Sequence, residues 1–275
     1  MIGVVIPAHN EEASLARCLR SILAAARNPA LAGEAVRTVV VLDDCTDRSG
    51  EIARHYGVES LALQARNVGA ARAAGAQRLL EAGARWLAFS DADSRVSPGW
   101  LATQLSLGAD AVCGSICVDD WSVQSPELCD YFRRTYMDAD GHRHVHGANL
   151  GVSAQAYLRA GGFAPLACSE DVALVEQLQA TGARIAWSAA PRVVTSARRA
   201  SRAPGGFGDT LCAWAAALAL DASQHRAAAQ AYESGLHLAP KRDLESAHLR
   251  EPERELDPSF DRAINPDLDP AFDQV

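Results

Sequence analysis

The sequence predicts an α/β fold in which a mostly parallel sheet is flanked by helices, followed by a helical C-terminal part and a polar tail. Short apolar runs alternate with segments of helical spacing through the first half of the chain. The runs are continuous rather than alternating, which is typical of parallel strands covered on both faces. Hydrophobic residues make up 48% of the 275 residues, which is enough for the core of one large domain.

Five strands are expected in the first half, at Ile2–Pro7, Thr38–Asp43, Ser60–Gln64, Trp86–Ser90 and Ala111–Val118. Helical spacing is kept between them by Leu15, Cys18, Leu19, Ile22 and Leu23, and after Gly75 by Leu79 and Leu80. Strand–helix repetition of this kind indicates a doubly wound, Rossmann-like sheet, which binds ligands at the carboxyl ends of its strands.

The second half changes character and is expected to be mainly helical. Helices are expected over Pro126–Met137, shortly before Gly161-Gly162, from Ser169 to about Ala180, and over Leu211–Tyr232. Ser169 is the expected N-cap of the third helix, and Gly182 its C-terminal stop. Residues 240–275 are charged, and ELDPSFD is echoed by DLDPAFD, which predicts an acidic tail, extended or disordered.

Composition argues against several classes of function. The formal net charge is -8, and the tail, with ten acidic and five basic residues, accounts for most of it. The rest of the chain is therefore near neutral, which argues against binding to nucleic acid. Lys241, in the tail, is the only lysine, so a P-loop lysine and a Schiff-base lysine are both excluded from the core.

Cysteine usage and hydropathy indicate the compartment. The seven cysteines include no C-x-x-C pair and are typical of a reducing cytoplasm. A strand pattern begins at Ile2, which leaves no room for a signal peptide, and the longest late apolar run, Leu211–Leu220, is too short to span a bilayer. We therefore expect a bacterial cytoplasmic protein without a transmembrane segment, able at most to contact the inner membrane face peripherally.

Polar loops follow the first two strands. The loop in VVIPAHNEE contains Pro7, Ala8, His9, Asn10 and Glu11, and the loop in VVVLDDCTD contains Asp43, Asp44 and Asp47. A carboxylate at a strand end can accept a hydrogen bond from a base N–H or a ribose hydroxyl, so the two loops predict a nucleoside site. For the first loop, capping of the next helix by Asn10 or a neighbour is the alternative.

Two carboxylates follow the fourth strand in FSDADS. Asp91 and Asp93 flank Ala92, so in extended geometry both side chains point the same way. Two convergent carboxylates beside a diphosphate suit Mg²⁺ or Mn²⁺, because both ions prefer oxygen ligands. The D-x-D sequence therefore predicts a metal and diphosphate site.

A second acidic pair, Glu170 and Asp171, opens the helix expected after Ser169. Asp171 shares a helical face with Leu174, Val175 and Leu178, so we expect it to point inward and to accept a proton from a hydroxyl. Stabilisation of the helix start by acidic residues, without a catalytic role, is the alternative.

The ordered set VVIPAHNEE, VVVLDDCTD, NVGAARAAG, FSDADS and GGFAPLACSEDVALVEQL resembles family 2 glycosyltransferases of the GT-A fold, over roughly residues 2–200. The resemblance implies transfer of a sugar from a nucleotide-diphosphate sugar to an acceptor hydroxyl on a small molecule, a lipid-linked compound or a glycan. It also implies one domain over 1–239, with a nucleotide-binding half of about 1–110 and an acceptor-binding half of about 111–239.

The same resemblance implies roles for particular residues. Both polar loops and Arg72 are expected to bind the nucleotide sugar. Asp91, Ala92 and Asp93 are expected to bind the nucleotide sugar, with Asp91 and Asp93 holding its diphosphate and Mn²⁺ or Mg²⁺. Asp171, with Glu170 beside it, is expected to act as the catalytic base.

The sequence departs from the family pattern at three places. NVGAARAAG is shorter than the usual spacing, so Arg66 is an alternative to Arg72 as the arginine facing the diphosphate. Cys45 stands where the family usually has glycine. No Q-x-x-R-W motif follows, which implies transfer of a single sugar rather than polymerisation.

Three alternating histidines precede the acidic pair. An extended segment would place His142, His144 and His146 on one face, where one of them could complete the metal site. Membership of a surface or acceptor loop is the alternative, and the sequence leaves both open.

Further arginines and tryptophans also have two interpretations each. Arg198, Arg199 and Arg202 lie where the family often has a mobile loop over the diphosphate, although a solvated basic turn fits equally well. Trp121 and Trp187 fit either stacking on an acceptor or burial in the core.

Three other classes compete with this interpretation. A dehydrogenase would need G-x-G-x-x-G after the first strand, where this chain has PAHNEE. A non-catalytic nucleotide-binding protein would be expected to lack at least one of Asp91, Asp93 and Asp171, and all three are present. A retaining transferase of the same fold, of the glucosyl-3-phosphoglycerate synthase type, is the remaining alternative to an inverting enzyme.

Overall fold

The computed structural model describes residues 1–166, 168–198 and 206–236. The chain divides into a compact unit, Met1–Cys212, and a second unit, Ala213–Val275. The tail expected over 240–275 lies outside the described residues, as do Arg199 and Arg202. The proposed domain over 1–239 therefore stays a prediction.

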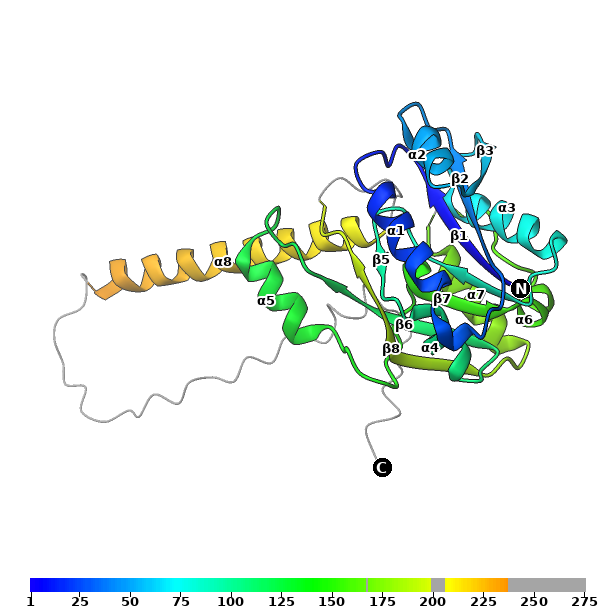
Figure 1. The fold of residues 1–275 in the computed structure, drawn as a ribbon. Helices are drawn as coiled ribbons and strands as arrows, with labels where there is room; N and C mark the ends of the chain where they lie inside the picture. Colours follow the sequence, from blue (N-terminus) through cyan, green and yellow to red (C-terminus); the bar gives the residue numbers. More distant parts are fainter. Residues whose placement is uncertain (167, 199–205, 237–275) are drawn as a thin grey trace. The chain divides into compact units, whose positions relative to one another are not determined.

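One sheet forms the centre of the first unit (Figure 1). Its strand order is β3-β2-β1-β4-β7-β6-β8-β5. The strands are β1 (Ile2–Ala8), β2 (Val36–Asp43), β3 (Glu59–Leu63), β4 (Trp86–Phe89), β5 (Arg95–Val96), β6 (Ala111–Val118), β7 (Leu150–Ser153) and β8 (Ile185–Thr195). The pairs β1–β2, β2–β3, β1–β4 and β6–β8 are parallel, whereas β4–β7, β6–β7 and β5–β8 are antiparallel.

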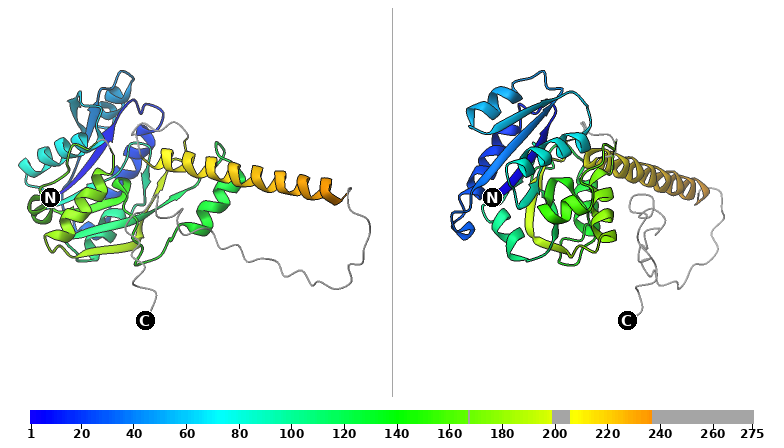
Figure 2. Two further views of the ribbon diagram at one scale, coloured as in Figure 1. Left: turned by 180° about the vertical axis from the view of Figure 1, so that it is seen from behind. Right: turned by 90° about the vertical axis from the view of Figure 1, so that its right-hand side faces the viewer.

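Helices cover both faces of this sheet (Figures 1 and 2). On one face the core includes residues of α1 (Leu15–Ala26), α2 (Ser49–His55) and α4 (Trp100–Ser106). On the other face it includes residues of α3 (Val68–Glu81), α6 (Ala154–Arg159) and α7 (Glu170–Ala180). The prediction of an α/β fold with a mostly parallel sheet flanked by helices is confirmed.

The second half contains more strand than the sequence predicted. The expectation of a mainly helical region missed β7 and β8, and the short β5 was missed in the first half. Two short helices, α2 and α4, were also missed in the first half. Strand β8 carries Pro191 and several alanines in its middle, so its β-branched residues are confined to its ends, at Ile185 and at Val193, Val194 and Thr195.

Close packing of α3 on the sheet depends on Gly75. A Cβ atom there would lie 2.5 Å from Val5 Cγ1 of β1, so any larger residue would push the helix away. The helix begins where the Asn67 side chain caps it by accepting a hydrogen bond from the Ala70 N–H, at 2.9 Å. Together these two features bring the N-terminal turns of α3 to the carboxyl ends of β1 and β2.

Two further helices complete the described chain. In α5 (Pro126–Thr135), Leu128, Tyr131 and Phe132 are buried. The helix α8 (Phe207–Leu236) starts in the first unit, where the Phe207 ring lies 6.0 Å from that of Phe132. The helices among the described residues include none that is long and apolar enough to cross a membrane.

Candidate active site

The loops after β1 and β2 are held together at the carboxyl edge of the sheet. The Asn10 side-chain oxygen accepts hydrogen bonds from the backbone N–H groups of Thr46 (2.8 Å) and Asp47 (3.3 Å). Asn10 adopts a left-handed φ of 54°, which asparagine tolerates better than most residues. Asn10 does not cap α1, whose N-cap is Ser14, so the capping alternative is wrong for this residue.

Pro7 and Ala8 are the last residues of β1, and His9 is the first residue after the strand. His9 Nδ1 lies 2.7 Å from the Asp43 carbonyl oxygen. The structure therefore brings the two predicted nucleoside loops into direct contact. That they bind a nucleoside stays a prediction.

Asp43 is buried and its carboxylate organises the loop before α3. It accepts hydrogen bonds from the backbone N–H groups of Ala65 (2.7 Å), Arg66 (2.9 Å) and Asn67 (2.8 Å). Since an ionised carboxylate offers about four lone-pair sites, roughly one acceptor position remains for a ligand. Asp43 therefore shapes this edge of the site, with room for one further donor.

The two candidate diphosphate arginines lie in opposite environments. Arg66 is 77% exposed and pairs with Asp44 at the rim of the loops. Arg72, from the first turns of α3, is only 5% exposed, and its guanidinium faces the protein interior. Of the two, Arg66 is the one open to a bound ligand.

The D-x-D segment forms a turn rather than an extension of the strand. Strand β4 ends at Phe89, and the Ser94 N–H donates to the Asp91 carbonyl oxygen at 3.0 Å. The expectation of extended geometry is therefore wrong, and Ala92 between the two carboxylates is buried. Asp91 Oδ1 lies 2.6 Å from Arg72 Nη2, whereas Asp93 Oδ2 lies 3.2 Å from Arg198 Nη2.

Arg198 joins the first loop to the D-x-D turn. Its guanidinium contacts both Glu11 oxygens, with Nη2 to Oε1 at 2.7 Å and Nη1 to Oε2 at 2.8 Å. Burial raises the pKa of Asp93 to about 6, with Asp91 and Glu11 adding to the rise and Arg198 opposing it. Three carboxylates thus share one place where a positive charge is stabilised, and Arg198 supplies that charge here.

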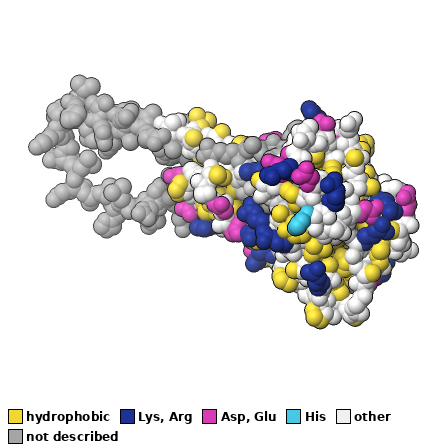
Figure 3. Space-filling model, turned by 45° about the horizontal axis from the view of Figure 1, so that its top comes forward, with side chains coloured by type: hydrophobic (Ala, Val, Ile, Leu, Met, Phe, Trp, Pro, Cys, Tyr) yellow, Lys and Arg dark blue, Asp and Glu magenta, His cyan; other side chains and the backbone are white. Residues whose placement is uncertain are grey.

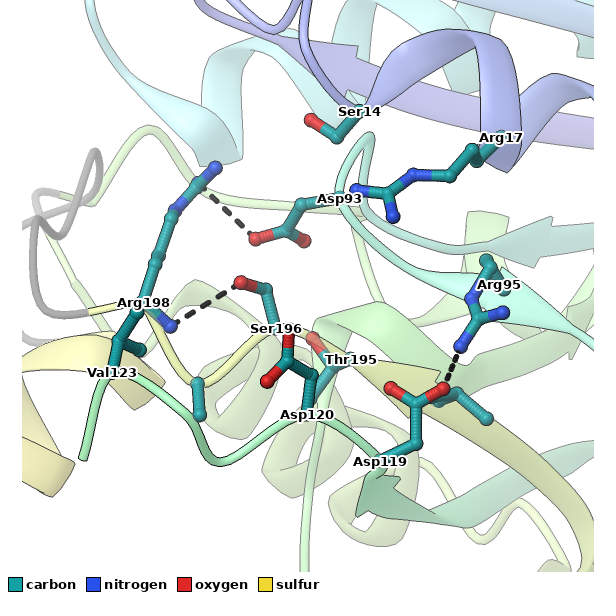
Figure 4. Close-up of a pocket in the computed structure, with 12 residues that line it drawn as sticks. Ser14, Arg17, Asp93, Arg95, Asp119, Asp120, Val123, Thr195, Ser196 and Arg198 are labelled. Carbon is teal, nitrogen blue, oxygen red and sulfur yellow. Dashed lines mark hydrogen bonds and ion pairs between the residues drawn. The ribbon is translucent and has the colours of Figure 1, made fainter. Parts of the chain in front are cut away.

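A cavity of about 150 Å³ opens beside Asp93 (Figure 4). The guanidinium groups and carboxylates that line it come from the start of α1, the D-x-D turn, β5, and the segments that follow β6 and β8: Arg17, Asp93, Arg95, Asp119, Asp120 and Arg198. Ser14, Thr195 and Ser196 add hydroxyl groups. Such a lining suits a ligand rich in hydroxyl or phosphate oxygens.

The acidic pair at the start of α7 divides into two environments. Glu170 is 4% exposed and forms an ion pair with Arg72. Burial raises the pKa of Glu170, and the nearby Arg72 charge opposes that rise. Asp171 is half-buried, and its Oδ2 accepts a hydrogen bond from the Gly147 N–H at 2.6 Å.

Two expectations for this helix are corrected. Glu170, rather than Asp171, continues the buried line of Leu174 and Leu178, because these three residues follow each other at a spacing of four. Ser169 is the N-cap residue but has a left-handed φ of 58°, and its side chain makes no capping hydrogen bond. Asp171 therefore borders the core instead of pointing into it.

Gly147 was missed as a site residue because its role depends on contacts that are distant in sequence. A Cβ atom there would lie 2.4 Å from the guanidinium of Arg72. The absence of a side chain lets this backbone lie against Arg72 and donate to Asp171. The sequence signal was only a glycine in GHRHVHGANLGVS, between two predicted elements.

Replacing Gly147 by alanine is therefore expected to displace Arg72 or the loop, destabilising the protein by about 1–3 kcal/mol and lowering turnover. Gly99→Ala is the matched control, because its Cβ would lie 3.7 Å from the nearest atom, in Thr103. Chemical denaturation of both variants checks the prediction. Equal stabilities would show that the guanidinium moves aside freely.

The three histidines form a stack with Tyr136. His144 lies 4.3 Å from the Tyr136 ring, 5.4 Å from His142 and 5.9 Å from His146, between ring centroids. Within the described residues no set of three or more His, Cys, Asp or Glu side chains is placed to hold a metal ion. A role for one of these histidines as a further metal ligand stays a prediction.

Acid should destabilise the protein through this stack. Burial lowers the pKa of His146 to about 3, so as the pH falls the unfolded chain takes up the proton first. Against an unfolded value near 6.5, this costs about 2 kcal/mol of unfolding free energy between pH 7 and pH 5. Denaturation at both pH values should show a smaller loss of unfolding free energy for His146→Gln. The glutamine amide can replace His146 Nε2, which lies 3.0 Å from the Tyr136 hydroxyl. An unchanged loss would place the sensitivity elsewhere.

Both tryptophans take part in packing within the described structure. Trp121 lies 5.2 Å from the Phe132 ring and donates its Nε1–H to the Val118 carbonyl at 3.2 Å. Trp187 lies beneath the Arg143 guanidinium, at 5.2 Å. Stacking on an acceptor stays a prediction for both.

Surface charge is mixed on one face of the molecule. On the face shown in Figure 3, arginine side chains and acidic side chains are interspersed with apolar and neutral ones. A broad basic surface, as nucleic acid binding requires, is not visible on this face.

Comparison with known proteins places the chain among the glycosyltransferases. The family model described as glycosyl transferase family 2 matches residues 3–157. No curated protein sequence matches the chain.

Solved structures share the fold at low sequence identity. TarS 1–349 from S. aureus, in complex with UDP-GlcNAc, is 15% identical with a TM-score of 0.58, over 75% of this chain and 61% of that one. The chain thus spans less than two thirds of that relative. The mannosyltransferase PcManGT from Pyrobaculum calidifontis, in complex with GDP-Man and Mn²⁺, is 18% identical with a TM-score of 0.54, over 86% and 80%.

A third similar structure is glucosyl-3-phosphoglycerate synthase from Mycobacterium tuberculosis, in complex with Mn²⁺, UDP and glucosyl-3-phosphoglycerate. It is 18% identical with a TM-score of 0.50, over 72% of each chain. At such identities these structures establish the fold, which is GT-A. Because the family model covers more than half of the chain, the protein belongs to glycosyl transferase family 2.

Proposed function

We propose that the protein is a metal-dependent glycosyltransferase that moves one sugar from a nucleotide-diphosphate sugar to an acceptor hydroxyl, with inversion and with Asp171 as the base. The observation that carries this proposal is the placement of Glu11, Asp91, Asp93 and Asp171 around one edge of the sheet. Arg72 links the D-x-D turn to the acidic pair of α7 through Asp91 and Glu170.

The donor is proposed to bind across the loops after β1 and β2. These loops offer backbone groups, His9 and the remaining acceptor position of Asp43, and the exposed Arg66 lies at their rim. The similar structures of TarS and PcManGT hold UDP-GlcNAc and GDP-Man, which supports a nucleotide sugar as the donor class.

A divalent metal fits the residues beside the diphosphate position. The Asp93 side chain is 13% exposed, and the Arg198 guanidinium lies between Asp93 and Glu11. Asp91 and Asp93 are the residues that would hold Mn²⁺ or Mg²⁺, together with diphosphate oxygens. When bound, the metal would stabilise negative charge on the departing nucleoside diphosphate.

Asp171 is proposed to take the proton from the attacking hydroxyl. The Gly147 N–H fixes one carboxylate oxygen at 2.6 Å, and Val172 N–H donates to the other at 2.9 Å. Within the described part of the chain the Asp171 carboxylate accepts these two hydrogen bonds, so lone pairs remain for a substrate hydroxyl. This arrangement orients the base before the acceptor arrives.

A retaining transfer is the second candidate. It is favoured by the similarity to glucosyl-3-phosphoglycerate synthase, which has the same fold and was solved with Mn²⁺ and UDP. In that case Asp171 would hold the acceptor without removing its proton in a direct displacement. The anomeric configuration of the product distinguishes the two mechanisms.

Thermal-shift screening against a panel of nucleotide sugars, with and without Mn²⁺, tests the proposed function. One donor is expected to raise the melting temperature in the presence of Mn²⁺ and to have little effect in its absence. Failure of every nucleotide sugar and every nucleoside diphosphate to shift the melting temperature would contradict the proposal.

A further inference from the structure

Arg72 connects the two halves of the candidate site through a buried ionic bridge. Its Nη2 lies 2.6 Å from Asp91 Oδ1, and its Nη1 binds Glu170 Oε1. The Arg72 and Glu170 side chains are each 5% exposed, whereas Asp91 is 35% exposed. One guanidinium therefore holds a partly exposed carboxylate and a buried one.

The surroundings leave this guanidinium little freedom to move. The Gly147 backbone lies against it so closely that a Cβ atom would be 2.4 Å from Cζ. The Phe163 ring centroid lies 5.8 Å from Cζ on the way to the core. The buried Arg72 Nε has no hydrogen-bond partner within the described structure, so the two carboxylates carry the polar interactions of this group.

The charges of the bridge matter for a cation bound at Asp91. With Glu170 present, the bridge sums to one negative charge, because two carboxylates face one guanidinium. Without the Glu170 charge, the guanidinium and Asp91 would cancel. A divalent ion at the D-x-D turn would then meet a neutral pair in place of an anionic group, in a region of low effective dielectric.

From this geometry we infer that Glu170 is a positioning residue for the metal site: it neutralises Arg72, so that Arg72 can orient Asp91 without cancelling its charge. The inference rests on the proposed metal-dependent function and assigns to Glu170 a role separate from the base Asp171. It also explains why a carboxylate with no access to substrate occupies the buried line of α7.

The test measures the binding of Mn²⁺ alone to the full chain. The concentration of free Mn²⁺ is determined by electron paramagnetic resonance. Glu170→Gln keeps the shape of the side chain and removes its charge, and it is expected to weaken Mn²⁺ binding about tenfold. Glu176→Gln, an exposed carboxylate on the same helix, is the matched control and is expected to bind as the unmodified protein does.

A rescue variant separates charge balance from simple structural damage. Arg72→Met in the Glu170→Gln background removes the uncompensated positive charge, so Mn²⁺ affinity is expected to return to within about threefold of the unmodified protein. Turnover should stay low in this double variant, because Asp91 has lost the group that orients it. A double variant that binds Mn²⁺ as weakly as Glu170→Gln would overturn the inference.

Arg72→Lys tests the inference independently, in case Glu170→Gln folds poorly. Lysine keeps the positive charge at position 72, and Glu170 keeps its negative charge, so Mn²⁺ affinity should stay within about twofold. Because an ammonium cannot bridge two carboxylates as a planar guanidinium does, turnover should fall about tenfold. Loss of Mn²⁺ affinity in this variant would also reject the inference. Asp93→Asn identifies a failure of the proposed function itself: unchanged Mn²⁺ binding there would reject the metal site, whatever Glu170 does.

Discussion

Asp171→Asn is expected to lower turnover by about 10²–10⁴-fold while leaving donor affinity within about twofold. Asparagine has nearly the same size and keeps an oxygen for the hydrogen bond from the Gly147 N–H, at 2.6 Å. What it loses is the ability to accept a proton from the acceptor hydroxyl. The loss should therefore appear in turnover with the acceptor and not in donor binding.

Initial rates with the donor found by thermal shift, and calorimetry of donor binding, provide the two measurements. Glu176→Gln, exposed on the same helix, is the control for a lost charge. Near-normal turnover in Asp171→Asn would remove the base from the mechanism. A product of retained anomeric configuration would favour the retaining alternative, in which Asp171 binds the acceptor only.

Glu170→Gln should differ from Asp171→Asn in which step it affects. The Glu170 carboxylate is bound to Arg72 and 4% exposed, so it cannot reach a substrate hydroxyl. Its loss should act through metal binding and be partly overcome by raising the Mn²⁺ concentration. The loss in Asp171→Asn should not respond to added Mn²⁺, because proton removal is not a binding step.

The sequence was sufficient to predict the strands that carry the donor side of the site. Strands β1 and β2 are centred on the apolar runs VVI and VVVL, a local pattern that needs no knowledge of the partner strand. The parallel pairing of β1 with β2 then places the loops that follow them at one edge. The contact between the Asn10 and Asp43–Asp47 loops follows from that topology.

Other features depend on pairing that no local pattern reveals. Strand β7 has four residues and exists because β4 and β6 offer antiparallel partners on either side. The environment of Arg72 is set by Asp91, 19 positions away, and by Glu170, 98 positions away. A window of local sequence shows only an arginine on an alanine-rich helix.

The sequence predicted Asp171 as the inward-pointing residue, whereas Glu170 is the buried one, and this difference has a local cause. Helix α7 begins at Glu170 after a left-handed residue, and its buried line passes through Glu170, Leu174 and Leu178. The apolar pattern of the helix fits either acidic residue as the inward one, since Val175 is also buried. Only the ion pair with Arg72 decides between them.

Asp93→Asn is expected to abolish metal-dependent donor binding and at the same time to stabilise the fold. Burial raises the Asp93 pKa from 3.8 to about 6. At pH 7 the ionised Asp93 carboxylate is therefore less stable in the folded protein than in the unfolded chain. A neutral asparagine removes that cost, which amounts to about 1–3 kcal/mol of unfolding free energy at pH 7. The gain should shrink as the pH falls below 6, where Asp93 takes up its proton.

Asp91→Asn should also abolish metal-dependent donor binding, but with the opposite effect on stability. It weakens the ion pair that Asp91 forms with the buried Arg72 at 2.6 Å and leaves Glu170 as the remaining charged partner. Breaking one side of a buried ionic bridge is destabilising, by about 1–3 kcal/mol where one partner remains. Asp130→Asn, whose side chain is 70% exposed, is the control and should change neither quantity.

Calorimetry of donor binding with and without Mn²⁺, together with denaturation at pH 7, measures both effects in each variant. The metal site predicts that the two variants lose the Mn²⁺-dependent part of donor affinity and keep the metal-free part. The buried bridge predicts that their stabilities move in opposite directions. Unchanged donor binding in both variants would contradict the metal assignment. Stability changes of the same sign would contradict the predicted difference between Asp93, held by Arg198, and Asp91, held by the buried Arg72.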